Sequence, residues 1–444
     1  MRPSREHPDT AAAQWAASGA LWLTGDPAGK PDHSRAAIVS RARLVADSFT
    51  AATGVPIDVG IELAGRAAQL GLSRRGRISA GGATRLLEAS DGWCALTLAR
   101  AGDWAAVPAL VATADYGTAP GPDIRASSTA DSVVADAWKA ITRWSAQRPA
   151  TDVVARARLL GLPAAVLGEQ APARPIVRRI GPAGAARTPA GCLVVDLSSM
   201  WAGPLCGRLL RQAGATVIKV ESPSRPDGTR AGAPAFFDWM NAGKLCYATD
   251  FDDARLLREL LLRADVVLES SRPAALTRRG LGPELPARPG RVWARITAHG
   301  TGHGAHWTGF GDDAAVAGGL VAVGAGGPYF CADAVADPLT GLKAARAVVE
   351  SLARGGGELI ELSLSAVAAE YAALPIVPAT PGLLAARPTA PTVTAHASRL
   401  GGDNAAVHLL ADSLSRSDHT GPVDAHGTLC HSPLKRSIFF NDTN

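Results

Sequence analysis

The segment VVDLSSMWAGPLCGRLLRQAGATVIKVESPSRPDGTR, Val194–Arg230, decides the fold of this chain. The apolar run Cys192–Leu197 predicts a strand, and the leucine spacing of Gly203–Ala213 predicts a short helix that stops at the next glycine. A second apolar run, Thr216–Val220, predicts another strand. We therefore expect a strand–helix–strand unit, whose two strands lie parallel in one sheet.

The same alternation continues towards the carboxyl end. Strands are predicted at Asp265–Glu269 and Val292–Thr297, and helices at Asp253–Ala264 and Leu342–Ala353. Strands that alternate with helices are typical of a parallel sheet covered by helices. The sequence thus predicts an α/β fold with a Rossmann-like parallel sheet domain and a second, smaller, α-rich α+β domain.

The 444 residues are too many for one compact core and suit two or three domains. A stretch dense in Pro, Gly, Ala and Arg predicts a linker, with the boundary near Ala185. The expected division is an α-rich segment 1–170, a linker 171–190, a Rossmann-like domain 191–375, a closing segment 376–429 and a peripheral tail 430–444.

Composition excludes several classes of function. The net charge of +5 is spread along the chain, so we expect no nucleic-acid surface. The six cysteines form no C-x-x-C pair, which indicates neither a metal site nor a disulfide framework and favours the reducing cytoplasm. No apolar segment is long enough to cross a membrane, so no membrane partner is expected. The hydrolase, metalloprotease and P-loop signatures are also missing.

Four collinear segments resemble family III CoA-transferases, the CaiB/BaiF family. They are Val194–Arg230, FFDWMNAGKLCYATDF at 236–251, ADVVLESSRPAALTRRGLG at 264–282, and RVWARITAHGTG at 291–302. The resemblance implies an enzyme that moves coenzyme A between an acyl-CoA thioester and a small carboxylic acid. It also implies a homodimer, in which the two chains of such proteins can interlock.

A fifth segment, Asp337-Pro338-Leu339-Thr340-Gly341, resembles the family's D-x-x-T-G motif, whose aspartate is the nucleophile. From the pattern alone, an Asp before Pro reads as a helix N-cap. The positive end of that helix would keep the carboxylate ionised, with a pKa below about 3.9. The resemblance implies an aspartyl anhydride and then an aspartyl-CoA thioester on Asp337. Asp333 is the competing carboxylate.

The resemblance also implies residues that contact CoA. Basic side chains would bind its phosphates, and the residues after the first strand would face its thioester end. The positions carried over are Trp201, Ala202, Lys244, Ser271, Arg272, Arg278 and His299.

The order of the segments differs from that of the family. The family's opening motif begins here near residue 190, whereas WAASGALWLTGDPAGK at 15–30 resembles the middle of family members. Either a permuted single unit or two incomplete copies would explain this order. Two alternatives to transfer stay open: an α-methylacyl-CoA racemase, although Phe310 stands nearest the position of its catalytic His, and a non-catalytic family subunit.

Overall fold

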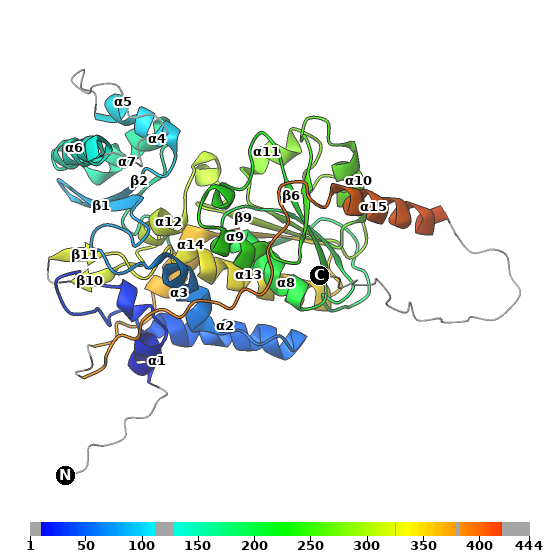
Figure 1. Cartoon of the computed structure of the whole chain (residues 1–444), viewed down its shortest axis with the longest axis horizontal. Helices are drawn as coiled ribbons and strands as arrows, with labels where there is room; N and C mark the ends of the chain where they lie inside the picture. The colour runs from blue at the N-terminus through cyan, green and yellow to red at the C-terminus, as the bar shows by residue number, and fades with distance from the viewer. Residues whose placement is uncertain (1–9, 112–127, 325, 379, 381, 420–444) are drawn as a thin grey trace, which may run out of the picture.

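A seven-stranded sheet forms the centre of the molecule (Figure 1). The computed structural model describes residues 10–111, 128–324, 326–378, 380 and 382–419. The strands, in their order across the sheet, are β4 (Ile176–Arg179), β12 (Glu358–Ser363), β9 (Val292–Thr297), β8 (Val266–Glu269), β5 (Leu193–Leu197), β6 (Thr216–Glu221) and β7 (Leu245–Ala248). All neighbours pair in parallel except β4, which is antiparallel to β12.

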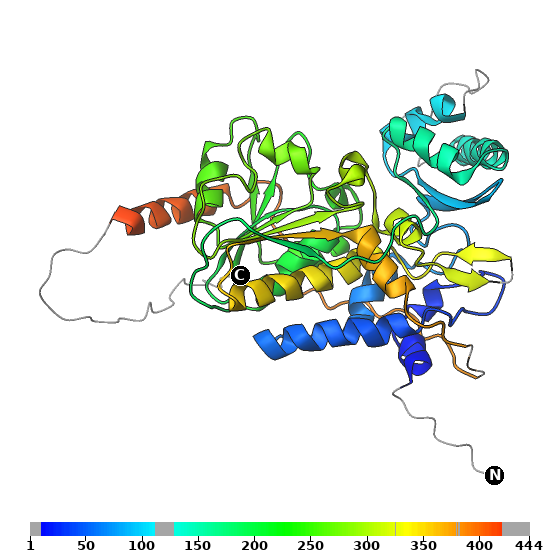
Figure 2. The same cartoon turned by 180° about the vertical axis from the view of Figure 1, so that it is seen from behind.

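Helices cover both faces of this sheet, as the apolar strands require. Every residue of β5 and β8 is buried, which is typical of parallel strands between two helical layers. One face packs against α8 (Ala202–Gln212) and α13 (Ala336–Ala353), and the other against α10 (Arg255–Arg263) and α15 (Asn404–His419) (Figures 1 and 2). The predicted α/β fold with a parallel sheet is confirmed.

The strand order reverses between β5 and β8. From β7 to β12 the six parallel strands follow one another along the chain in the ranks 3-2-1-4-5-6. The connections therefore leave β5 and β8 towards opposite sides, and open sheets of this kind bind ligands beyond the carboxyl ends of such strands. The loops after β5 and β8 thus lie where sheets of this kind bind their ligands.

A second, smaller core lies beside the sheet. It combines the antiparallel strands β1 (Thr84–Ala89), β2 (Gly92–Thr97) and β3 (Ala164–Val166) with four helices. These helices are α4 (Ala101–Ala105), α5 (Val107–Val111), α6 (Ser128–Ser145) and α7 (Ala150–Leu159). The helix α6 and the antiparallel pair β1–β2 both belong to this unit.

The first helices of the chain belong to the large core instead. α1 (Ala11–Ala17), α2 (Ala37–Thr53) and α3 (Val59–Leu70) contribute Trp15, Phe49 and Leu63 to the cluster that also holds residues of β5 and α13. The predicted segment 1–170 is therefore divided between two cores. The predicted linker is also more than a linker, because its residues 176–179 form β4 at the sheet edge.

The closing segment returns across the first helices. Ala386 N donates to Ala16 O at 2.9 Å, and His396 Nδ1 lies 2.7 Å from Asp238 Oδ2 before the chain reaches α15. The expected tail 430–444 lies outside the described residues. The remaining elements are α9 (Pro234–Asn241), α11 (Pro273–Thr277), α12 (Gly311–Ala317), β10 (Ala322–Gly324), β11 (Gly327–Tyr329) and α14 (Leu364–Ala372). None of the described helices is long and apolar enough to cross a membrane.

Candidate functional site

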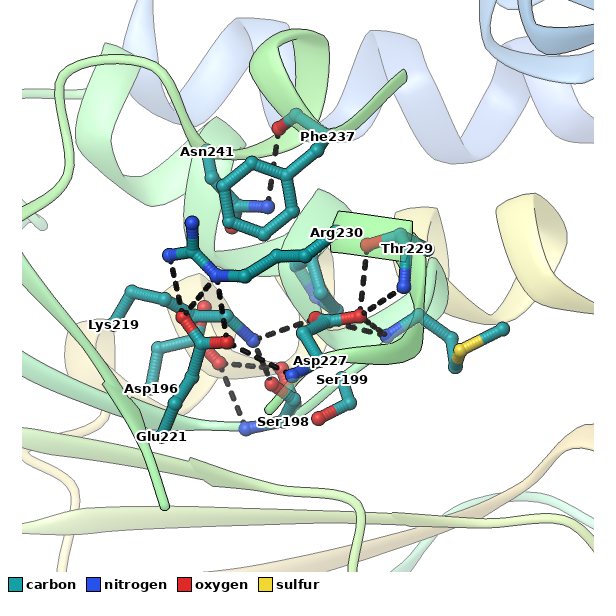
Figure 3. A network of polar contacts seen from close by, with 12 residues as sticks. Asp196, Ser198, Ser199, Lys219, Glu221, Asp227, Thr229, Arg230, Phe237 and Asn241 are labelled. Carbon is teal, nitrogen blue, oxygen red and sulfur yellow. Dashed lines mark hydrogen bonds and ion pairs between the residues drawn. The ribbon is translucent and has the colours of Figure 1, made fainter. Parts of the chain in front are cut away.

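A buried polar network supports the loop that follows β5 (Figure 3). Asp196 accepts from Ser198 N at 3.0 Å, and Lys219 Nζ donates to Asp227 Oδ2 at 2.9 Å. Asp227 also accepts from Met200 N at 3.2 Å, which holds Met200 at a left-handed φ of 74°. Each buried charge therefore has a partner, and the loop 198–200 is fixed by them.

The carboxylates of Asp196 and Asp227 stay ionised despite their burial. Burial by itself would raise the pKa of Asp196 and Asp227, but the neighbouring lysines outweigh it. Lys244 and Lys219 lower the pKa of Asp196, and Lys219 holds that of Asp227 at about 2. The network therefore supports the site structurally. Its carboxylates are not suited to exchange a proton near neutral pH.

Two glycines let α8 and α13 approach the loop closely. A Cβ on Gly203 would lie 2.2 Å from the Ser198 side chain, so only glycine allows the first turn of α8 to fold over the loop. On α13, a Cβ on Gly341 would lie 2.8 Å from Ala202 O. This close crossing brings the first turn of α13, which carries Asp337, to the carboxyl end of β5.

Asp337 lies in the first turn of α13 but does not cap it. The helix begins at Ala336 and its N-cap is Val335, so the predicted capping role is wrong. The Asp337 carboxylate instead accepts from the backbone N–H of Gly311, at the start of α12. A Cβ on Gly311 would lie 2.4 Å from Asp337 Oδ2, so glycine permits this contact.

The expected low pKa of Asp337 is also wrong. Burial and the nearby carboxylate of Asp312 raise its pKa to about 7, and Asp333 adds to the rise. Arg66 and the Gly311 N–H act in the opposite direction without cancelling it. The helix end alone would lower the pKa, but burial and the two neighbouring carboxylates raise it.

Asp333 is held more tightly than Asp337. Its Oδ1 lies 2.6 Å from Nη1 of Arg66, and its side chain is 0% exposed. Its neighbours Ala332 and Ala334 have left-handed φ values of 56° and 43°, a strained conformation for alanine. Asp337 has no ion pair among the described residues, so of the two carboxylates it is the one free to react.

Arg66 was not predicted, because no sequence pattern marks a lone arginine in an Ala-rich helix. It lies on α3, more than a hundred residues before the family-like segments. Its guanidinium lies 5.6 Å from the ring centre of Trp201 and 5.7 Å from that of Phe236. The first helices of the chain therefore contribute a charge to the site formed by α12 and α13.

The predicted CoA contacts fall into different surroundings. Trp201 and Ala202 are 3% and 4% exposed and lie where α8 begins. Lys244 is 3% exposed, and its Nζ donates to Asp196 Oδ2 at 2.9 Å, to Pro204 O at 2.9 Å and to Asn241 Oδ1 at 3.0 Å. All its hydrogens are engaged, so the expectation that Lys244 binds phosphate is corrected: it belongs to the supporting network.

The residues after β8 remain accessible. Arg272 and Arg278 flank α11 and are exposed, while Ser271 is half-buried. This loop is tied to the loop after β5, because Ser199 N donates to Ser270 Oγ at 3.0 Å. Both loops lie at the point where the strand order reverses, and the contact of these arginines with CoA stays a prediction.

His299 follows β9 and is buried. Burial and the charge of Arg158 lower its pKa to about 4, so the imidazole is neutral at pH 7. It borders a cavity of about 180 Å³, together with residues of β9, β12 and the segment before β4. A neutral imidazole can contact a ligand through a hydrogen bond but not through a positive charge, and the CoA contact of His299 stays a prediction. The described residues contain no cluster of side chains that would hold a metal ion.

The sheet domain is similar to parts of known proteins. The family model described as CoA-transferase family III matches residues 190–392. The chain is 37% identical over 140 residues to the "probable fatty acyl-CoA transferase" of Mycobacterium tuberculosis, a match that covers 29% of this chain and 35% of the relative. It is 30% identical over 200 residues to the succinate–glutarate CoA-transferase of Agrobacterium fabrum, over 39% of this chain and 50% of the relative.

The matches span about a third to a half of these relatives' own length. Among solved structures, a CaiB/BaiF family protein from Brucella suis is 30% identical, with a TM-score of 0.39 over 42% of this chain and 56% of that chain.

Proposed function

We propose that the chain is a member of CoA-transferase family III and that it moves coenzyme A from an acyl-CoA thioester to a carboxylic acid through Asp337. The observation that carries this proposal is the position of Asp337. Its carboxylate lies in the first turn of α13, beside the Gly311 N–H, without an ion pair among the described residues.

The first half of the reaction forms an acyl-enzyme. An oxygen of the Asp337 carboxylate attacks the thioester carbonyl of the donor, the C–S bond breaks, and CoA leaves as a thiolate. The thiolate then attacks the aspartyl carbonyl of the mixed anhydride and releases the donor acid as a carboxylate. Asp337 now carries CoA as a thioester, and no proton has been gained or lost.

The second half repeats these steps in reverse order. The carboxylate of the acceptor acid attacks the aspartyl-CoA carbonyl and expels the CoA thiolate, which leaves a new mixed anhydride. The thiolate then attacks the acceptor's carbonyl, so that acceptor-CoA departs and the Asp337 carboxylate is restored. The Gly311 N–H is positioned to donate to negative charge on the aspartyl oxygen in each step.

Binding of the CoA phosphates is proposed for Arg272 and Arg278. They are exposed at the loop after β8, and planar guanidinium groups bind phosphate through paired hydrogen bonds. Trp201 and Ala202, at the start of α8, would face the thioester end of the ligand. A racemase gains no support from Phe310, because this residue is the N-cap of α12 and its side chain cannot carry a proton.

We further propose that the protein acts as a homodimer in the cytoplasm, with no metal. The interlocked dimers implied by the family resemblance support the homodimer. Light scattering at micromolar concentration should then give twice the mass of 45.5 kDa.

Trapping of the acyl-enzyme tests the proposal directly. The protein is mixed with a panel of acyl-CoA donors and hydroxylamine, which captures activated carboxylates, and is then digested for mass spectrometry. The proposal expects a hydroxamate on Asp337 that depends on the donor. A hydroxamate on Asp333, or transfer that is undiminished in Asp337→Asn, would overturn it. Asp47→Asn, an exposed change on α2, is the matched control.

A further inference from the structure

Arg66 is surrounded by more negative charge than it can neutralise. It forms the ion pair of 2.6 Å with Asp333, and the carboxylates of Asp312 and Asp337 also act on it. Asp312 is itself fixed, because its Oδ1 accepts from Ala334 N at 3.0 Å. One guanidinium therefore faces three aspartates in a largely buried site.

The position of this guanidinium is fixed by the first helices of the chain. Asp58 caps α3 by accepting from Ile61 N at 3.1 Å. The same helix is joined to α8 by an ion pair of 2.5 Å between Glu62 and Arg208, both buried. The aromatic rings of Trp201 and Phe236 lie beside the guanidinium of Arg66. The Arg66 guanidinium thus cannot turn away from the carboxylates without losing its contacts with these two rings.

We infer that Arg66 is a positioning residue for the transfer reaction: through its ion pair with Asp333, it offsets the negative charge around Asp337 and so favours the ionised carboxylate that attacks the thioester. This inference rests on the proposed function. A carboxylate must carry its negative charge to be a nucleophile, and the neighbouring carboxylates oppose that charge. The charged groups that face Asp337 from the packed elements are Asp312 on α12, Asp333 in the loop before α13, and Arg66 on α3. Arg66 is the cation among them.

Removal of the guanidinium should therefore shift the pH profile. In Arg66→Gln we expect the acidic limb of kcat/KM to move to higher pH by about one unit, which is roughly a tenfold loss of rate below the pKa. At pH 9 the variant should recover most of its activity, because Asp337 is then ionised without help. Arg66→Lys keeps the charge and should shift the profile less. A purely structural role would lower the rate equally at every pH.

A second measurement needs no substrate. The protein is labelled with ¹³C at the aspartate carboxyl groups, and the Asp337 signal is assigned by its loss in Asp337→Asn. We expect the pKa of Asp337 to rise in Arg66→Gln and to fall in Asp333→Asn, which removes a negative charge and frees the guanidinium. Arg43→Gln, an exposed arginine on α2, should leave it unchanged.

The outcomes separate the two proposals. An unshifted or lowered pKa of Asp337 in folded Arg66→Gln would overturn the role of Arg66. If Arg66→Gln does not fold, the Asp333→Asn titration decides, and a raised pKa there would overturn it. If no donor and acceptor pair supports transfer by the wild-type protein, the proposed function fails, while the titration still decides the charge role.

Discussion

The reactivity of Asp337 depends on its protonation state near neutral pH. Burial and Asp312 raise its pKa from 3.8 to about 7, so below pH 7 most molecules carry a neutral carboxyl group. Only the ionised form attacks a thioester. We therefore expect kcat/KM for transfer to rise through about pH 7 and to level off above it. A profile that is flat between pH 5 and 8 would contradict the raised pKa.

Asp337→Asn should separate chemistry from stability. The amide is a very poor nucleophile, so transfer should fall about 1,000-fold or more. The stability of the folded protein should instead increase at neutral and alkaline pH. A carboxyl group whose pKa is higher in the folded state makes the fold less stable as pH rises from its unfolded pKa to its folded pKa, here from 3.8 to about 7.

The Asn variant removes this penalty. Its melting temperature should match that of the wild type near pH 4 and exceed it by roughly 2 °C or more at pH 8. Melting curves at both pH values check the sign. A variant that melts lower than wild type at pH 8 would show that the Asp337 carboxylate stabilises the fold.

The sequence predicted the chemical group at this site better than its surroundings. The D-x-x-T-G motif singled out Asp337, whereas Asp312 and Arg66 reach the site from elements far apart in the chain. Lys244 shows the same limit: its motif position was clear, but a sequence does not reveal that three buried oxygens accept its hydrogens. A pKa is set by distances between such groups, and pattern alone does not supply them.

At the level of elements, the close crossing of α8 and α13 determines where Asp337 lies. The Gly341→Val variant places a branched side chain where even a Cβ would be 2.8 Å from Ala202 O and Leu205 Cδ2. We expect the helices to separate, with a loss of roughly 2–3 kcal/mol in the free energy of unfolding and a strong loss of transfer. Denaturant unfolding measures the first quantity.

Gly102→Ala is the matched control for this crossing. Gly102 lies in α4, and a Cβ there meets no atom within 4 Å, so the variant should be neutral or slightly more stable. Equal stability of Gly341→Val and wild type would mean that the two helices adjust without cost.

The elements themselves were predictable where apolar runs are long. The unit β5–α8–β6 and the strands β8 and β9 were read from such runs. β4 was missed because all four of its residues are exposed at the sheet edge, so they show neither a continuous apolar run nor alternation. An edge strand of this kind is defined by the partner it pairs with, here β12.

At the scale of the whole molecule, sequence order and packing order differ. The first three helices share a core with the sheet, although β1 to β3 and the predicted linker stand between them in the chain. Arg35 shows this joining directly: its Nε donates to Val321 O at 2.7 Å and its Nη1 to Ala372 O at 2.8 Å. The sequence predicted an α-rich segment here but carried no information about which core receives its helices.

This packing predicts two separable responses to core mutation. Phe49 on α2 is 1% exposed within the large core, so Phe49→Ala should cost roughly 3–5 kcal/mol and loosen the sheet that it helps to cover. Trp138 on α6 is 2% exposed within the small core, and Trp138→Ala has a similar expected cost. The two variants should differ in which part of the fold loses stability.

Hydrogen exchange read by mass spectrometry distinguishes them. In Phe49→Ala, faster exchange should extend from α2 to α13 and β5, because these elements share one cluster. In Trp138→Ala, it should stay within β1 to β3 and α6 to α7. If Phe49→Ala instead affected β1 to β3 and spared β5, the first half of the chain would fold as one unit. Its contribution of Arg66 to the site would then depend on docking between two independent domains.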